Sequence, residues 1–225
     1  MRLMDTTNPV QRLLDMPPSI PTVVVVDDDI SVRESLELLI QSEGWQPALF
    51  ESAQEFLARL PNVVPSCLIL DVNLPDLSGL DIQQRISDEK FSTPIIFITG
   101  YGDVPTSVRA MKAGAAEFLT KPLDDEVLIE AIRAAVLRSE ANLKREGAQR
   151  QLQERFDSLS KREREVMNLV VKGLMNKQVG YELNISEITV KAHRGRVMDK
   201  MHATTFVDLV NIAGRLGIST AREIR

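Results

Sequence analysis

The stretch Cys67-Leu68-Ile69-Leu70-Asp71 decides the fold of this chain, because an apolar run ends abruptly in a carboxylate. The first apolar run, Val23–Val26, ends in the same way in Asp27-Asp28-Asp29. Short apolar runs bounded by Asp, Gly or Pro are typical of strands buried on both faces of a parallel sheet. Carboxylates that end two neighbouring strands meet at one edge of that sheet, where like charges repel unless a cation holds them. Hard oxygen ligands favour Mg²⁺, so an acidic metal pocket is the leading hypothesis for the site.

Strands and helices alternate from Thr22 to about Leu143. Helices with apolar residues at helical spacing are predicted at Ile30–Glu43 and Val104–Ala113, each ending before a glycine. Five βα units predict an α/β fold, a doubly wound five-stranded parallel sheet of order 2-1-3-4-5. Ligands bind such sheets beyond the strand ends, between the first and third strands. The predicted strands are Thr22–Val26, Gln46–Phe50, Cys67–Leu70, Ile95–Ile98 and Ala116–Leu119.

The region 158–225 contains only helical signals. Ser160 and Glu163 have capping-box spacing and begin a helix that ends near Gly173. Helices at about Asn176–Leu183 and Glu187–Met201 come next, and Thr204 or Thr205 begins a fourth. Two short helices followed by a basic one are typical of an all-α helix-turn-helix domain.

The spacing also predicts the domain organisation. The stretch Asp125–Phe156 has the spacing of one long helix that continues into a charged linker. Its predicted apolar face comprises Leu128, Ile132, Val136 (or Ala135) and Leu143. The four predicted regions are a disordered N-terminal extension at 1–20, the α/β domain at 21–140, a helical linker at 141–157 and the helix-turn-helix domain at 158–225.

Composition argues against disulfide-rich, secreted and membrane-spanning classes of protein. Apolar residues make up 44% of the chain, enough for real cores, and the single cysteine, Cys67, excludes an internal disulfide framework. No apolar stretch is long enough for a signal peptide or a membrane span, so we expect a soluble cytoplasmic protein without a membrane partner. The whole chain has a net charge of −5. Residues 156–225 carry +4, so residues 1–155 carry −9. The two parts are therefore expected to have different partners.

Two later strands of the predicted sheet end near the same pocket. Thr99 follows one strand, and Lys121 follows the other closely. A Mg²⁺ ion held by Asp28 and Asp71 would neutralise an incoming phosphoryl group, whose remaining oxygens Thr99 and Lys121 would bind. Asp71 could then attack as a nucleophile and form an aspartyl phosphate.

These motifs resemble the receiver domain of two-component response regulators, over residues 22 to about 140. The resemblance implies that Asp71 is the phosphoacceptor and that Thr99 and Lys121 contact the phosphoryl group. Phe118 stands at the family's rotating aromatic switch position, and Lys121-Pro122 resembles its cis-proline step. The metal site implied by the family, for Mg²⁺ or Mn²⁺, comprises Asp27, Asp28, Asp71 and the main-chain carbonyl of Asn73. The motifs that carry the resemblance are Val26-Asp27-Asp28-Asp29, Leu70-Asp71-Val72-Asn73-Leu74-Pro75-Asp76-Leu77-Ser78-Gly79, Ile98-Thr99-Gly100 and Leu119-Thr120-Lys121-Pro122.

The helix predicted at Glu187–Met201 is the candidate DNA-binding element. Val190 (or Ile188), Val197 and Met201 form its apolar face. Cations and small residues on the rest of the helix suit close approach to the major groove. The residues expected outside are Thr189, Lys191, Ala192, Arg194, Gly195 and Arg196, and all of these except Gly195 are candidate DNA contacts.

Residues 159 to about 216 resemble the LuxR-type helix-turn-helix, in which Lys191 and Ala192 match base-facing positions and Gly195 stands where some members carry lysine. Together the two resemblances point to the NarL/FixJ class. They imply a phosphorylation-activated transcriptional regulator rather than an enzyme, with slow autodephosphorylation at most. The expected partners are a sensor histidine kinase, double-stranded promoter DNA, RNA polymerase and a second copy of the chain. The expected dimer face comprises Val104, Val108, Arg109, Met111 and Lys112.

Two other functions fit parts of the pattern. The α/β domain of a DNA-binding protein could serve as a constitutive or ligand-sensing dimerisation module, which the presence of Asp28, Asp71 and Lys121 disfavours. A haloacid-dehalogenase phosphatase would also use Asp71 as nucleophile. Such enzymes place a general acid two residues later, where this chain has Asn73, and an amide cannot donate and recover a proton.

Overall fold

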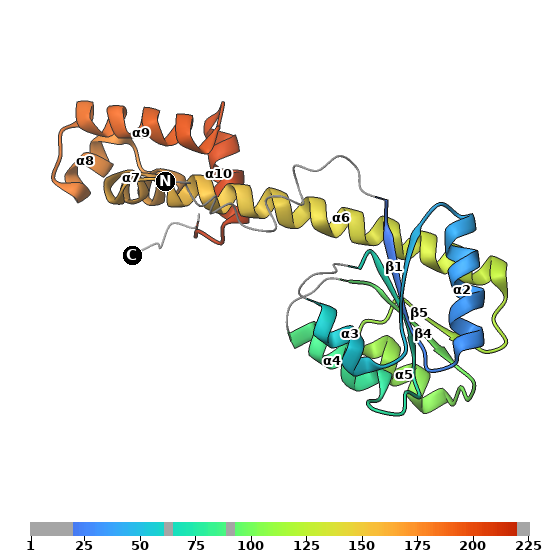
Figure 1. Cartoon of the computed structure of the whole chain (residues 1–225). Coiled ribbons are helices and arrows are strands. Elements are labelled where there is room, and N and C mark those ends of the chain that lie inside the picture. The colour runs from blue at the N-terminus through green and yellow to red at the C-terminus, as the bar shows by residue number, and fades with distance from the viewer. Residues whose placement is uncertain (1–19, 61–64, 89–92, 220–225) are drawn as a thin grey trace, which may run out of the picture. The chain divides into compact units, whose positions relative to one another are not determined.

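The computed structural model describes residues 20–60, 65–88 and 93–219. The chain divides into two compact units, Met1–Leu143 and Lys144–Arg225. The predicted N-terminal extension, residues 1–20, lies outside the described residues except for Ile20. Figure 1 shows a sheet covered by helices in the first unit and a group of helices in the second.

The described residues of the first unit form one five-stranded parallel sheet of order β2-β1-β3-β4-β5, as predicted. The first two strands match their predicted bounds. The third and fourth extend one residue further, through Asp71 and Thr99, and the fifth is shifted by one residue. The strands are β1 (Thr22–Val26), β2 (Gln46–Phe50), β3 (Cys67–Asp71), β4 (Ile95–Thr99) and β5 (Glu117–Thr120).

Helices cover both faces of the sheet (Figure 1). Helices α3 (Ala53–Arg59), α4 (Gly79–Asp88) and α5 (Val104–Lys112) lie on one face, and α2 (Ile30–Ser42) and the first turns of α6 (Asp125–Asp157) lie on the other. Successive strand residues point to opposite faces. Val24 and Val26 accordingly pack with α3, α4 and α5, whereas Val23 and Val25 pack with α2 and α6.

Side-chain caps and one close glycine contact fix where the helices begin. Asp29 accepts a hydrogen bond from the Ser31 amide and caps α2. At the start of α4, a Cβ on Gly79 would lie 2.6 Å from the main-chain oxygen of Asp71. The absence of a side chain at Gly79 therefore lets α4 begin directly against the end of β3.

Helix α6 is continuous over 33 residues. Leu128, Ile132, Ala135 and Val136 are buried, as predicted, but Leu143 is 43% exposed. Leu143 lies beyond the apolar cluster that α6 packs against in the first unit, which includes no residue after Val136.

In the described part of the second unit, four helices follow α6: α7 (Lys161–Val171), α8 (Asn176–Leu183), α9 (Glu187–Met201) and α10 (Phe206–Arg215). The capping box of Ser160 and Glu163 is present, and Thr205 caps α10. Val190, Val197 and Met201 are buried and Ile188 is exposed, so Val190 is the core residue of the two alternatives.

Candidate functional site

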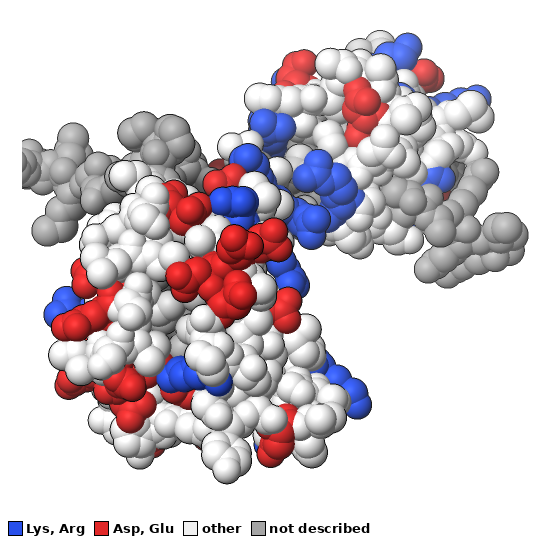
Figure 2. Space-filling view, turned by 90° about the vertical axis from the view of Figure 1, so that its right-hand side faces the viewer, with Lys and Arg blue, Asp and Glu red and all other residues white. Residues whose placement is uncertain are grey.

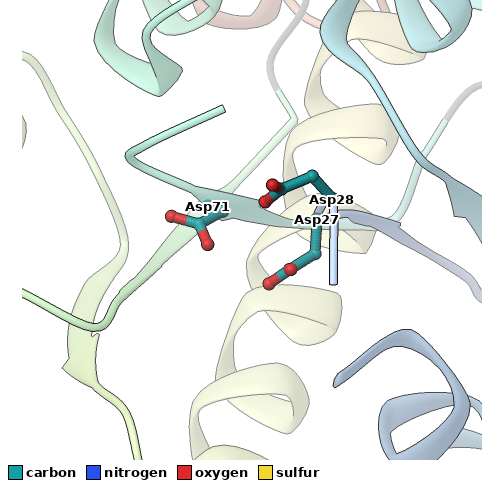
Figure 3. A group of neighbouring side chains, drawn as sticks. All are labelled: Asp27, Asp28 and Asp71. Atoms are coloured by element: carbon teal, nitrogen blue, oxygen red, sulfur yellow. The ribbon is translucent and has the colours of Figure 1, made fainter. Parts of the chain in front are cut away.

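Three carboxylates meet at the carboxyl edge of the sheet. Asp27 and Asp28 follow β1, and Asp71 ends β3; one oxygen of each lies within 4.8 Å of the others (Figure 3). Asp27 and Asp71 are buried, while Asp28 is exposed. The parallel neighbours β1 and β3 thus bring together side chains more than 40 residues apart in sequence.

Lys121, from the segment after β5, lies between two of these carboxylates. Its Nζ is 2.7 Å from Oδ2 of Asp27 and 2.7 Å from Oδ2 of Asp71. Burial lowers the pKa of the Lys121 ammonium, but the hydrogen bonds to the two carboxylates together outweigh burial and raise that pKa above its ordinary value. Burial raises the pKa of Asp27, against the opposing hydrogen bond from Lys121. The peptide bond between Lys121 and Pro122 is cis.

Backbone amides fix the other oxygens of the two buried carboxylates. The Asp29 amide donates to Asp27 Oδ1 at 2.9 Å, and the Asn73 amide donates to Asp71 Oδ1 at 2.8 Å. Arg33, in the first turn of α2, donates from Nη1 to the main-chain oxygen of Asp27 at 2.6 Å. No sequence pattern marks Arg33 as part of the site, because a cation near the start of a helix is common on protein surfaces.

Thr99 and Asn73 connect the pocket to the next strand. Thr99 is buried at the end of β4, and its hydroxyl accepts a hydrogen bond from the Asn73 side-chain amide at 3.3 Å. The same hydroxyl donates to the Tyr101 carbonyl and accepts from the Tyr101 amide, both at 3.2 Å. Phe118 is half-buried, with its ring centroid 6.3 Å from that of Phe97.

The donor set fits a hard divalent cation. Asp27, Asp28 and Asp71 offer carboxylate oxygens, the ligands that Mg²⁺ and Mn²⁺ favour, and the exposed Asp28 leaves the pocket open to water. Asn73 forms an isolated antiparallel β-bridge with Ser78, just after β3 ends at Asp71. The arrangement can hold a cation and, next to it, an oxyanion that contacts Lys121.

The five residues predicted as a dimer face all lie on the exposed side of α5. Val104 is 74% exposed, and Val108 and Met111, four and seven residues later, are exposed on the same side. Arg109 and Lys112 lie beside them, also exposed, while Ala110 faces the core. The result is an apolar strip with adjacent cations.

The predicted DNA-contacting residues of α9 do not all lie in the same environment. Lys191, Ala192 and Arg196 are exposed. Thr189 is exposed too, but its hydroxyl oxygen lies 2.8 Å from Oγ of the helix cap Ser186. Lys191 has a weak ion pair with Glu187 at 3.7 Å.

The sequence predicts Arg194 on the exposed face of α9, but the structure places it partly in the packed interface between helices. It is half-buried, donates from Nη1 to Asn176 Oδ1 at 3.2 Å, and its guanidinium carbon lies 5.3 Å from the centre of the Phe206 ring. The reason is helical spacing, because Arg194 follows Val190 by four residues and precedes Val197 by three, on the buried side of α9. Arg194 therefore links α9 to α8 and α10.

The sequence places the net negative charge in residues 1–155. Figure 2 shows many Asp and Glu side chains and fewer Lys and Arg on the visible face of the sheet-containing unit.

The described residues include no helix that is long and apolar enough to cross a membrane.

Comparisons with known proteins cover both units. Residues 23–133 match the model of the response regulator receiver domain, and residues 157–213 match that of the bacterial regulatory proteins of the luxR family. Nodulation protein W of Bradyrhizobium diazoefficiens is 51% identical over 88% of this chain and 87% of its own length. The response regulator protein TodT of Pseudomonas putida is 45% identical over 86% of each chain.

Solved structures agree with these relatives. The response regulator StyR superposes with a TM-score of 0.79 at 42% identity, over 88% of this chain and 100% of that chain. Full-length FixJ from B. japonicum superposes with a TM-score of 0.54 at 39% identity, over 88% of this chain and 98% of that chain.

Proposed function

Because this chain belongs to the two-component response regulators that combine a receiver domain with a LuxR-type DNA-binding domain, we propose that it is a transcription factor switched by phosphorylation of Asp71. The observation that carries the proposal is the meeting of Asp27, Asp28 and Asp71 at one strand edge with Lys121 2.7 Å from Asp71. Phosphorylation is a signal here and not a step in substrate turnover, with slow autodephosphorylation at most.

In the proposed reaction an Asp71 carboxylate oxygen attacks the phosphorus of a phosphohistidine on a sensor histidine kinase. The oxygen–phosphorus bond forms, the phosphorus–nitrogen bond breaks, and the leaving imidazole takes up a proton. A Mg²⁺ ion held by Asp27, Asp28, Asp71 and the Asn73 carbonyl would supply charge neutralisation. Lys121, already in contact with Asp71, is in position to bind a phosphoryl oxygen.

The proposed switch acts through Thr99. Its hydroxyl is engaged by Asn73 and Tyr101 and must leave these partners to bind the phosphoryl group. We infer that Phe118 follows it inward and that the face around α5 then dimerises. The proposed dimer face comprises Val104, Val108, Arg109, Met111 and Lys112. Paired α9 helices would bind half-sites about one DNA turn apart.

The proposal also assigns the regions of the chain. We place the receiver at residues 21–140, the linker at 141–157 and the DNA-binding domain at 158–225. The DNA contacts proposed are Thr189, Lys191, Ala192 and Arg196, with Arg194 holding the helix in place. The protein would work in the cytoplasm, at promoters where RNA polymerase binds.

Intact mass after incubation with Mg²⁺ and acetyl phosphate tests the switch site. Wild type should gain one phosphoryl group, and Asp71→Asn should gain none. Asp29→Asn is the matched control, because it makes the same charge change beside the pocket while an amide oxygen can still cap α2. The control should be phosphorylated like wild type.

Promoter binding completes the test. Phosphorylated wild type should bind selected duplex DNA more tightly than the Asp71→Asn variant does. An absence of any adduct, together with equal DNA binding by both proteins, would contradict the proposal and favour a constitutive dimerisation module.

A further inference from the structure

Ile188 occupies the second position of α9 and is 80% exposed. Val190, the alternative core residue of this helix, is fully buried instead. A single exposed isoleucine is common on protein surfaces, so its neighbours decide its meaning.

The neighbours of Ile188 form the outermost face of α9. Residues three, four and seven positions later share a face of a helix, and these are Lys191, Ala192 and Gly195. All three are exposed, and apart from its chain neighbours and the nearby backbone of α9, no atom of the described residues lies within 4 Å of a Cβ built on Gly195. On this face Ile188 is the one large apolar side chain. Its neighbours are the small residues Ala192 and Gly195 and the charged Lys191.

The position of Ile188 along the helix is equally informative. The N-terminal residues of a recognition helix contact base edges in the major groove. The adjacent polar side chain, Thr189, has its hydroxyl next to the cap Ser186. Glu187, the other exposed side chain of this turn, lies 3.7 Å from Lys191. Ile188 is therefore the apolar side chain of the first turn that projects into solvent.

We propose that Ile188 is a specificity-determining residue that packs against the C5-methyl group of a thymine in each half-site. The proposal rests on the DNA-binding function of α9. An isoleucine side chain has no hydrogen-bond donor or acceptor, and in the major groove the thymine methyl is the apolar group that base edges present. Lys191 can contact a guanine or a phosphate beside it.

Replacement of thymine by deoxyuridine removes that methyl group alone. Operators are first selected from random duplex DNA with the full chain after treatment with acetyl phosphate and Mg²⁺. Each thymine is then replaced in turn, symmetrically in both half-sites. Wild type should lose about four-fold in affinity per half-site at one thymine position, the value for one buried methyl group.

The variant Ile188→Ala should bind the thymine and deoxyuridine forms of that position equally. Ile20→Ala makes the same change at an exposed isoleucine just before the receiver and should keep the wild-type loss. Circular dichroism checks that the variants fold, which the exposure of both residues favours.

Two outcomes would overturn the inference. One is a wild type that is indifferent to every replacement of thymine; the other is an Ile188→Ala variant that keeps the same loss as wild type. Both leave DNA binding intact, so they are distinguishable from a failure of the proposed function, in which phosphorylated wild type would select no operator at all.

Discussion

Lys121 balances the charge of the acidic pocket at the scale of a single residue. Its ammonium contacts Asp27 and Asp71 and is 21% exposed, so the two carboxylates depend on it when no other cation is bound. We expect Lys121→Gln to lower the free energy of unfolding by about 2 kcal/mol in EDTA, less than for a fully buried pair. Added Mg²⁺ should recover part of the loss by supplying positive charge.

Urea denaturation with EDTA and with Mg²⁺ measures this difference. The control is Lys112→Gln, which removes an exposed lysine of α5 and should respond to Mg²⁺ like wild type. Equal stabilisation of Lys121→Gln and wild type by Mg²⁺ would show that Lys121 does not carry this charge balance.

Asn73 restrains Thr99 in the unphosphorylated protein through one hydrogen bond at 3.3 Å. Asn73→Ala removes that bond and keeps the main-chain carbonyl. If the bond contributes about 1 kcal/mol, phosphorylation by acetyl phosphate should proceed about five-fold faster. Time-resolved intact mass gives the rate, with the exposed Asn211→Ala as control. An unchanged or slower rate for Asn73→Ala would argue against this restraint.

At the scale of the secondary-structure elements, Glu163 joins the start of α7 to the end of α9. Its Oε2 accepts from the Ser160 amide at 2.9 Å and from Lys200 Nζ at 2.7 Å, in a nearly buried position. The hydrogen bond from Lys200 is the main reason why the pKa of Glu163 falls from 4.5 to about 2. A capping residue is thus also one partner of an interhelical ion pair.

The lowered pKa of Glu163 gives a definite pH dependence. A carboxyl group whose pKa is lower in the folded state contributes its stability fully above its unfolded pKa, here 4.5, and loses it as the pH falls towards about 2. Between pH 7 and pH 3, wild type should lose about 1 kcal/mol more than Glu163→Gln, about half of the loss that the full pKa difference implies, because the partner Lys200 is partly exposed.

Urea denaturation at pH 7 and pH 3 measures the difference. Glu165→Gln, which alters a more exposed carboxylate two residues along α7, should lose as much as wild type. If wild type and Glu163→Gln lose the same free energy of unfolding between pH 7 and pH 3, the lowered pKa of Glu163 does not contribute to stability.

Arg194 connects three helices of the second unit. Arg194→Ala removes the hydrogen bond to Asn176 and the contact with the Phe206 ring, which together should cost about 1–2 kcal/mol. Thermal unfolding should show a lower melting temperature, and DNA binding should weaken for all sequences alike. Arg196→Ala, at an exposed position of the same helix, should leave the melting temperature unchanged. Equal melting temperatures for the two variants would assign no structural role to Arg194.

At the scale of the whole molecule, the exposed apolar strip on α5 predicts association. Val108 lies between Val104 and Met111 on this strip. Phosphorylated wild type should sediment as a dimer, and Val108→Asp should remain a monomer because a charge would be buried in the interface. Val127→Asp changes an exposed valine of α6 in the same way and should still dimerise. A phosphorylated Val108→Asp dimer would place the interface elsewhere.

Much of the fold and of the acidic pocket could be predicted because local patterns encode them. Apolar runs ending in Asp71 and Asp27 mark strand ends, and the parallel order of the sheet confirmed that these ends meet. The capping box of Ser160 and Glu163 and the bounds of α8 and α9 also follow from residues within a few positions of one another.

Tertiary structure alone decided which distant side chains meet. The contacts of Lys200 with Glu163, of Arg194 with Phe206 and of Asn73 with Thr99 join residues with no fixed spacing in sequence. Helical periodicity also left Ile188 and Val190 as alternatives, and packing against the neighbouring helices buried Val190 alone. The sequence determined the elements and the residue types at their ends because these depend on short-range backbone and capping interactions. The partners of individual side chains depend on how whole elements pack, which no local pattern contains.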